Sequence, residues 1–309
     1  MKKILILGGT GFLGQNIVKQ LADDYYLVVT GRDISNPIRH PNVVYRTLDF
    51  VQCEDYSSYL QDADLVIHLI STINPNDDMD HVNSEIEQNV FPTIKLLDDM
   101  VKNKIPEIIF LSSGGAVYGE CEAQNISETE SLDPISNYGI IKMLIEKYLQ
   151  LYHRFFGVNY KIVRLANPYS ENTKIEQKQG IIPILADKIL NHEVIDIWGD
   201  GNNLRDFIFI DDAIEAIRRI IEYNGDHKVF NLGTGIGHSL NDCIDLIKKY
   251  SNISEVTINY SAPRKCDVKN NILDISNTAK TLNWKPQTQL DEGIKKVLAK
   301  KCKERNENG

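Results

Sequence analysis

The first 22 residues constrain the fold of this chain more than any other stretch. Ile4–Leu7 is a short apolar run typical of a strand buried on both faces of a parallel sheet. Gly8, Gly11 and Gly14 follow at three-residue spacing. The next apolar residues fall on one helical stripe: Leu13, Ile17, Val18 and Leu21. The pattern predicts a strand, a tight glycine turn and an amphipathic helix.

Such a turn is suited to binding an anion. The first backbone N–H groups of a helix lack partners, and together with the helix dipole they favour a negative charge above the turn, typically a dinucleotide pyrophosphate. Glycines also mark ordinary turns, so the spacing alone does not separate the two interpretations. The position between an opening strand and a helix favours the dinucleotide site.

Composition excludes several classes of protein. The 309 residues carry a net charge of −9, which argues against a general nucleic-acid or membrane-surface binder but leaves an anionic small substrate open. Five cysteines without a C-x-x-C pair, and seven histidines without a metal-spaced cluster, predict neither disulfides nor a metal site. No apolar run approaches membrane length, and the opening apolar run is too short for a signal peptide, so we expect a cytoplasmic protein.

Strands and helices alternate through the first half of the chain. This order predicts an α/β fold, a doubly wound parallel Rossmann sheet with helices on both faces. The expected strands are Leu27–Thr30, Val43–Tyr45, Leu65–Ile70, Ile108–Leu111 and Tyr160–Leu165, and the expected long helices cover about 82–103 and 136–156.

Beyond residue 166 the loops lengthen and the elements shorten. We therefore expect a dinucleotide-binding domain over 1–166, to which 207–232 returns. A smaller mixed α/β substrate-binding lobe would comprise 167–206 and 233–300, and 301–309 would be a disordered tail. Ser239 and Asp242 have the spacing of a helix N-cap arrangement.

Tyr138 and Lys142 are four residues apart at the start of the second long helix, so their side chains share one face. A lysine ammonium close to a phenol favours the phenolate, and this predicts a lowered pKa that would let Tyr138 act as a base. Tyr-x-x-x-Lys also occurs by chance in helices. Its place in a chain that opens with a dinucleotide turn favours a catalytic role.

Together these motifs resemble the extended short-chain dehydrogenase/reductases, and among them the UDP-galactose 4-epimerase group. The resemblance covers roughly residues 2–298. The matching segments are Gly8–Gly14, Ser112–Gly119, Tyr138–Lys142, Asn167–Tyr169 and Arg205–Phe207.

The resemblance implies a role for each matching residue. Tyr138 would be the catalytic base, and Lys142 would bind the nicotinamide ribose. Asn89 and Ser112 would lie along the cofactor, and Asp49 with Phe50 near its adenine. The full set implied to bind the cofactor is Gly8, Gly11, Phe12, Leu13, Gly14, Arg32, Asp49, Phe50, Ile70, Asn89, Ser112, Tyr138 and Lys142.

The same resemblance places the substrate. Asn167, Arg205 and Arg264 would hold the diphosphate and sugar of a UDP-sugar, and two arginines from different loops suit a diphosphate chemically. A surface salt bridge is the alternative for Arg264. Counting on from it, Asn271 falls where the resembled epimerases control the room around C2 of the hexose. A small residue there would admit an N-acetyl group, unless Asn271 faces solvent at a strand edge.

Two positions depart from the family pattern. A Ser or Thr hydroxyl is usual four residues before the tyrosine of the Val-Tyr-Gly turn, where this chain has Gly114. Ser113 is the nearest substitute and our third candidate catalytic residue. At the end of the second strand, where an acid commonly marks NAD, the chain has Arg32 followed by Asp33. NAD is the expected cofactor, and Arg32 leaves NADP open.

These features predict an NAD-dependent nucleotide-sugar epimerase that acts on a UDP-hexose or UDP-N-acetylhexosamine through a 4-keto intermediate. A 4-keto-sugar reductase or dehydrogenase and a catalytically silent dinucleotide-binding protein are the alternatives. Gly115 and Ala116 stand where dehydratases of the family carry an Asp-Glu pair, which argues against dehydration. Both long helices have apolar residues on a second face, so we also expect a homodimer.

Overall fold

The computed structural model describes residues 1–73, 81–172 and 180–308, with the side chains of 306–308 left out. The chain divides into two compact units. Unit 1 comprises Met1–Gly119, Ser131–Arg164 and Ile217–Phe230, and unit 2 comprises Glu120–Glu130, Leu165–Ala216 and Asn231–Gly309. Each unit is described by itself.

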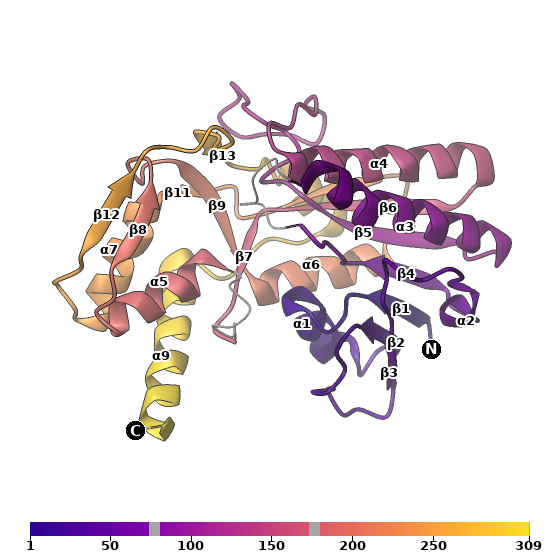
Figure 1. The fold of residues 1–309 in the computed structure, drawn as a ribbon, viewed down its shortest axis with the longest axis horizontal. Helices are drawn as coiled ribbons and strands as arrows, with labels where there is room; N and C mark the ends of the chain where they lie inside the picture. The colour runs from indigo at the N-terminus through magenta and orange to yellow at the C-terminus, as the bar shows by residue number, and fades with distance from the viewer. Residues whose placement is uncertain (74–80, 173–179, 309) are drawn as a thin grey trace. The chain divides into compact units, whose positions relative to one another are not determined.

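A seven-stranded sheet forms the centre of unit 1 (Figure 1). Its strand order is β10-β6-β5-β4-β1-β2-β3, and the pairings from β3 through β1 to β5 are parallel. This is the doubly wound order, in which the sheet grows in both directions from its first strand. The strands are β1 Lys3–Leu7, β2 Tyr26–Gly31, β3 Val43–Thr47, β4 Leu65–His68, β5 Glu107–Ser113, β6 Asn159–Leu165 and β10 Val229–Leu232.

The helices that connect these strands cover both faces of the sheet. Helices α3 (Val82–Lys102) and α4 (Asn137–Phe156) lie side by side on one face (Figure 1). Helix α1 (Phe12–Leu21) covers the other face, and α2 is the short turn Ser57–Leu60. The last turns of α6 (Ile210–Glu222) lie next to the end of α1, where Arg218 pairs with Asp24 at 3.0 Å.

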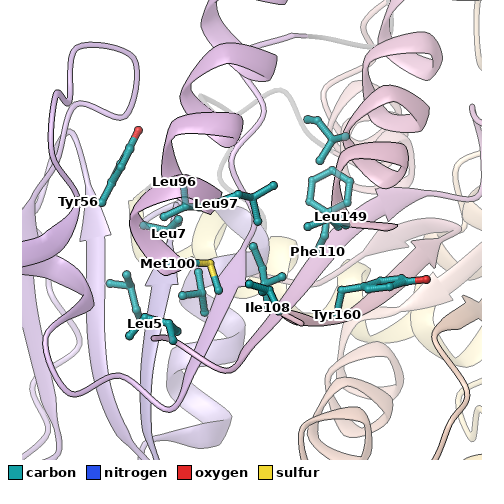
Figure 2. Packing of buried hydrophobic residues seen from close by; sticks show 14 of the residues in the cluster. Leu5, Leu7, Tyr56, Leu96, Leu97, Met100, Ile108, Phe110, Leu149 and Tyr160 are labelled. Atoms are coloured by element: carbon teal, nitrogen blue, oxygen red, sulfur yellow. The ribbon is translucent and has the colours of Figure 1, made fainter. Parts of the chain in front are cut away.

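Burial follows the predicted helical stripes. On α4, Ile141, Ile145 and Leu149 are almost fully buried and recur every four residues. They pack with side chains of α3 and with alternate residues of β1, β4 and β5 in one core (Figure 2). The labelled core residues are Leu5, Leu7, Tyr56, Leu96, Leu97, Met100, Ile108, Phe110, Leu149 and Tyr160.

Unit 2 contains two small sheets. In one, β9 (Leu204–Phe209) lies between β11 (Gly237–His238) and β13 (Asn270–Asn271), and β7 (Asn167–Tyr169) also pairs with it. In the other, β8 (Ile195–Trp198) and β12 (Ile258–Ser261) run parallel. Parallel and antiparallel pairings occur together, which makes this lobe a mixed one.

Four helices accompany these sheets: α5 Ile181–Leu190, α7 Leu240–Ser251, α8 Ser276–Leu282 and α9 Leu290–Asn308. The predicted N-cap is present, since Ser239 and Asp242 form a reciprocal capping box at the start of α7.

The expected disordered tail over 301–309 is wrong for the residues that the structure describes, because α9 continues to Asn308. Its last turns are attached to α5: Lys301 Nζ lies 2.8 Å from a carboxylate oxygen of Asp187, and Arg305 donates to the Leu190 carbonyl at 2.7 Å. The charged composition of this segment therefore reflects ion pairs and not an unfolded end.

Two boundaries also differ from the expected ones. Residues 120–130 belong to unit 2, although they lie within the segment expected to form the first domain. Of the segment 207–232, only Ile217–Phe230 returns to unit 1. Within the described residues, no helix combines the length and apolar character that a membrane span requires.

Candidate active site

The glycine turn is tightly packed on its inner side. Gly8 has φ +79°, and the Gly9 N–H donates to the Thr30 carbonyl at 2.9 Å, which ties the turn to β2. A Cβ on Gly14 would lie 2.4 Å from the Cα of Gly9, so α1 approaches the turn more closely than any side chain would allow.

The outer side of the turn is open. A Cβ on Gly11 would have one described atom within 4 Å, the Gly8 carbonyl oxygen at 3.4 Å. Gly11 is the N-cap of α1 and makes no side-chain cap bond, and the first turn of α1 holds no acidic residue. The N-terminus of α1 is therefore exposed and carries no side-chain cap, an arrangement that fits a pyrophosphate.

Ile70 lies beside this turn, and Asn89 bonds the loop two residues further along the chain. Ile70 packs against Gly8, with Cγ1 3.0 Å from where a Cβ would be. The amide of Asn89 on α3 is bonded to both the backbone N–H and the hydroxyl of Thr72, at 3.0 and 2.7 Å. Asn89 thus fastens the loop after β4. Phe12 is buried in α1, and Leu13 is half-buried.

The residues expected at the adenine end differ in burial. Arg32 and Asp33 are exposed at the end of β2, and the Ser35 N–H donates to Asp33 at 2.8 Å, which lowers the pKa of that carboxyl. Asp49 is exposed and accepts from the Val51 N–H at 3.0 Å. The Phe50 ring is in the core, 5.1 Å from the ring of His68, so its side chain is not available to a ligand.

Tyr138, Ser113 and Lys142 meet at the carboxyl end of β5. Ser136 caps α4 by accepting from the Gly139 N–H at 3.2 Å, and this places Tyr138 in the first turn. The Ser113 side chain is hydrogen-bonded to Tyr138. Lys142 Nζ lies 5.7 Å from the centre of the Tyr138 ring and donates to the Leu111 carbonyl at 2.9 Å.

The expected lowering of the Tyr138 pKa is wrong for this structure. Burial raises the pKa of Tyr138 above its ordinary value, and the hydrogen bond with Ser113 only partly opposes this effect. The Lys142 ammonium is directed at the Leu111 carbonyl, and its own pKa is lowered by burial to about 8. Spacing along a helix predicted that the two side chains are neighbours, but it could not predict how strongly both are desolvated.

A buried ion pair next to these residues was missed by sequence reasoning. Glu146 on α4 is fully buried, and its carboxylate accepts from Arg164 of β6 at 2.7 Å. The hydroxyl of Ser112 also donates to Glu146, and Arg164 donates to the Tyr118 hydroxyl at 2.9 Å. The signal was present: Tyr138, Lys142 and Glu146 form a polar series at four-residue spacing on a helix.

In unit 2, Arg205 and Arg264 are close enough to interact electrostatically. Burial lowers the pKa of Arg205, Asp267 raises it, and Arg264 lowers it further. Arg264 forms a two-pronged ion pair with Asp267, at 2.7 and 3.1 Å, and its guanidinium lies 4.4 Å from the ring centre of Trp198. Asp267 and Trp198 were not predicted. The salt-bridge alternative for Arg264 is observed, with Asp267 as its partner.

The two asparagines predicted for unit 2 lie on strands that pair with β9. Asn167 on β7 donates to the Asp206 carbonyl at 2.9 Å, and Asn271 on β13 is in register with Arg205. Asn271 is fully buried, so the alternative in which it faces solvent at a strand edge is wrong. These pairings bring Asn167, Arg205 and Asn271 together on one small sheet.

Metal binding receives no support from the described residues, among which no group of three or more His, Cys, Asp or Glu side chains could hold an ion. The lone histidine of the apolar strand, His68, is buried and contacts the Thr93 hydroxyl at 3.0 Å. Burial and the nearby charge of Lys142 lower the pKa of His68 to about 3, so it is neutral.

Comparison with known proteins agrees with this architecture. The model of the NAD dependent epimerase/dehydratase family matches residues 4–233. A Methanocaldococcus jannaschii protein named "Putative UDP-glucose 4-epimerase" is 35% identical over 96% of this chain and 97% of its own length. The dTDP-4-dehydro-6-deoxyglucose reductase of Escherichia coli is 30% identical over 97% and 98% of the two chains.

A solved structure has the same fold over nearly the whole chain. The UDP-glucose 4-epimerase of Thermotoga maritima, crystallised with UDP-glucose, superposes with a TM-score of 0.90 and 30% identity. The match covers 98% of this chain and 99% of the other. The doubly wound fold and the resemblance stated from the sequence are confirmed.

Proposed function

The chain belongs to the NAD-dependent epimerase/dehydratase family, and from that premise we propose that it is a UDP-sugar 4-epimerase. The observation that carries the proposal is the meeting of Tyr138, Ser113 and Lys142 at the end of β5, in the sheet whose first strand leads into the glycine turn. The family is NAD-dependent, and the open outer side of the Gly11 turn fits that cofactor.

Each polar group has a distinct task in this reaction. Tyr138 acts in its phenolate form, which burial disfavours and the groups beside it must stabilise. It takes the proton of the sugar 4-hydroxyl and returns it after the 4-keto sugar has rotated, so the proton balance is zero. Ser113 donates to the Tyr138 oxygen and thereby stabilises the phenolate. Lys142 supplies a positive charge beside the ring. The hydride chemistry at C4 of the sugar would be supplied by NAD held above the Gly11 turn.

Unit 2 would hold the nucleotide part of the substrate. Arg205 and Arg264 provide hydrogen-bond donors for a diphosphate. Asp267 keeps the guanidinium of Arg264 oriented before the substrate binds. A UDP-sugar carries the charge that these arginines suit, in a chain whose net charge is −9. The relatives named as acting on UDP-glucose support the same substrate class.

A 4-keto-sugar reductase is the second candidate, favoured by the relative of that activity in Escherichia coli. The two functions differ in how they use the coenzyme. An epimerase returns the hydride to the sugar and needs no added NADH, whereas a reductase consumes one NAD(P)H for each sugar.

The test is incubation of the purified protein with a panel of UDP-hexoses and UDP-N-acetylhexosamines, without added coenzyme, followed by chromatographic separation of the products. We expect interconversion of a C4-epimer pair. Conversion of a 4-keto sugar that depends on stoichiometric NAD(P)H, without epimer formation, would assign the chain to the reductases instead.

A further inference from the structure

Glu146 is a buried charge that the proposed reaction does not use. It is fully buried on α4, one helical turn after Lys142 and two after Tyr138. A buried carboxylate is costly unless its oxygens are bonded. Here Arg164 donates to both oxygens, with Nη2 at 2.7 Å and Nε at 3.2 and 3.3 Å, and the Ser112 hydroxyl donates to Oε1.

The hydrogen-bond partner of Glu146 on β5 is next in the chain to residues that bond the predicted catalytic groups. Ser112 precedes Ser113, which is hydrogen-bonded to Tyr138. Leu111 precedes Ser112, and its carbonyl accepts from Lys142 at 2.9 Å. The end of β5 is therefore bonded to Glu146, Lys142 and Tyr138 through three successive residues.

Glu146 also acts on Lys142 through its charge. Burial lowers the pKa of Lys142 to about 8, and the negative charge of Glu146 opposes this effect. Four other titratable groups lie on the elements packed around Lys142. They are His68 of β4, neutral with a pKa of about 3, Tyr138, a phenol whose pKa burial raises, Arg164 of β6, which is paired with Glu146, and Glu85 of α3, which accepts from Asn137. The carboxylate that acts on the pKa of Lys142 is that of Glu146.

We propose that Glu146 is a positioning residue of the active site, whose carboxylate fixes the Ser112–Ser113 end of β5 against α4 and places a negative charge one helical turn from Lys142. The proposal rests on the function proposed above, because Lys142 matters only if Tyr138 and Lys142 perform the chemistry. It assigns to Glu146 a task beyond holding β6 to α4.

A second buried ion pair offers a matched control. Lys161 of β6 is almost fully buried and pairs with Glu107 of β5 at 2.9 Å. Both pairs include a residue of β6, and Glu107 begins β5 at the end opposite to Ser112, the residue that bonds Glu146. Glu107→Gln therefore weakens a buried ion pair without touching Lys142.

The experiment compares Glu146→Gln with Glu107→Gln. Glutamine keeps an oxygen that can accept from Ser112 but carries no charge. Two readouts are recorded as a function of pH: kcat for the UDP-sugar, and the 13C shift of Lys142 Cε, assigned with Lys142→Met. In Glu146→Gln we expect the Lys142 titration and the alkaline limb of kcat to move to lower pH by about one unit. In Glu107→Gln neither should move.

The double variant Glu146→Gln/Arg164→Met guards against misfolding, because it removes the arginine charge that the single variant leaves unpaired. We expect it to recover thermal stability and to keep only part of the Lys142 shift, because the positive charge of Arg164 is removed as well. An unmoved Lys142 titration in folded Glu146→Gln would overturn the proposal and leave Glu146 with a structural role alone. The NMR titration needs no substrate, so a chain inert toward every UDP-sugar would refute the proposed function while the titration still decides the role of Glu146.

Discussion

At the scale of single residues, the site depends on groups whose charge is set by burial. The pKa values of Tyr138 and Lys142 move in opposite directions, up for the phenol and down for the ammonium, because desolvation disfavours the charged form of each. Because the ordinary pKa values of tyrosine and lysine are nearly equal, the two shifts move them apart. The phenol therefore keeps its proton to a higher pH, and the ammonium loses its proton at a lower pH.

Tyr138→Phe tests the proton transfer. The ring should keep its packing at the start of α4, while the oxygen that accepts the sugar proton is lost. We expect kcat to fall by about 10²-fold or more, with unchanged affinity for NAD. Tyr148→Phe, ten residues further along the same helix, is the control and should have normal turnover. Near-normal turnover in Tyr138→Phe would remove that residue from the mechanism.

Asn271 tests the specificity for the sugar. Its complete burial next to Arg205 in the sheet register agrees with a position inside the substrate lobe. We expect the wild type to accept UDP-N-acetylglucosamine, because an asparagine leaves more room than a tyrosine and its amide can bond the acetamido carbonyl.

Leucine has the same number and branching of side-chain heavy atoms as asparagine but no amide, so Asn271→Leu removes the hydrogen bond while it keeps the shape of the side chain. We expect the ratio of kcat/KM for the acetylated over the plain substrate to fall about tenfold in this variant. Asn271→Tyr should abolish turnover of the acetylated sugar. A wild type inert to that sugar, or ratios unchanged in both variants, would rule out the assignment.

At the scale of elements, the strand–turn–helix unit separates structural glycines from ligand-facing ones. Gly14 lies where α1 meets the turn, and a side chain there would overlap Gly9. Gly11 faces open space at the N-terminus of α1. Two glycines of one motif therefore have different physical reasons to be glycine.

Alanine at each position should reveal this difference. We expect Gly14→Ala to lower the free energy of unfolding by about 2 kcal/mol, because the turn must shift to admit the methyl group. Gly11→Ala should unfold like the wild type in urea but bind NAD at least about tenfold more weakly, because the methyl group occupies the space above the turn. Equal effects of both variants on stability and binding would contradict this division.

At the scale of the whole molecule, the assembly state follows from an apolar surface. Helix α4 buries one apolar stripe against the sheet and leaves a second one exposed, with Leu151 46% and Phe155 69% accessible. Phe91 on the adjacent α3 is 59% accessible. Exposed large apolar side chains on two adjacent helices are typical of a protein–protein contact. A second copy of the chain would cover it through a self-complementary helix pair.

We therefore expect light scattering at micromolar concentration to give twice the chain mass of 35.1 kDa. Leu151→Glu combined with Phe155→Glu should convert the dimer to a monomer, since two carboxylates per chain would be buried unpaired. Tyr260→Glu, at an exposed aromatic residue of unit 2, should stay dimeric. A monomeric wild type would contradict the prediction.

The sequence by itself determined the main strands and helices of unit 1 and the neighbouring positions of Tyr138 and Lys142 on one helix. Ile4–Leu7, the three glycines and the α1 stripe are local patterns, and each depends on spacing along one strand or helix. The same is true of Tyr138 and Lys142 on α4 and of the capping box at Ser239. Patterns of this kind can be recognised from the sequence because residues that are close along a strand or helix are also close in space.

Only the tertiary structure decided the electrostatics and the buried partners. The pairing of Glu146 with Arg164, 18 residues away, and of Arg264 with Trp198 depends on strands that meet through the fold. The helical end at 301–308 likewise depends on Asp187 and Leu190 of α5. Burial shifts a pKa according to everything packed around a group, and that environment is assembled from segments far apart in the chain.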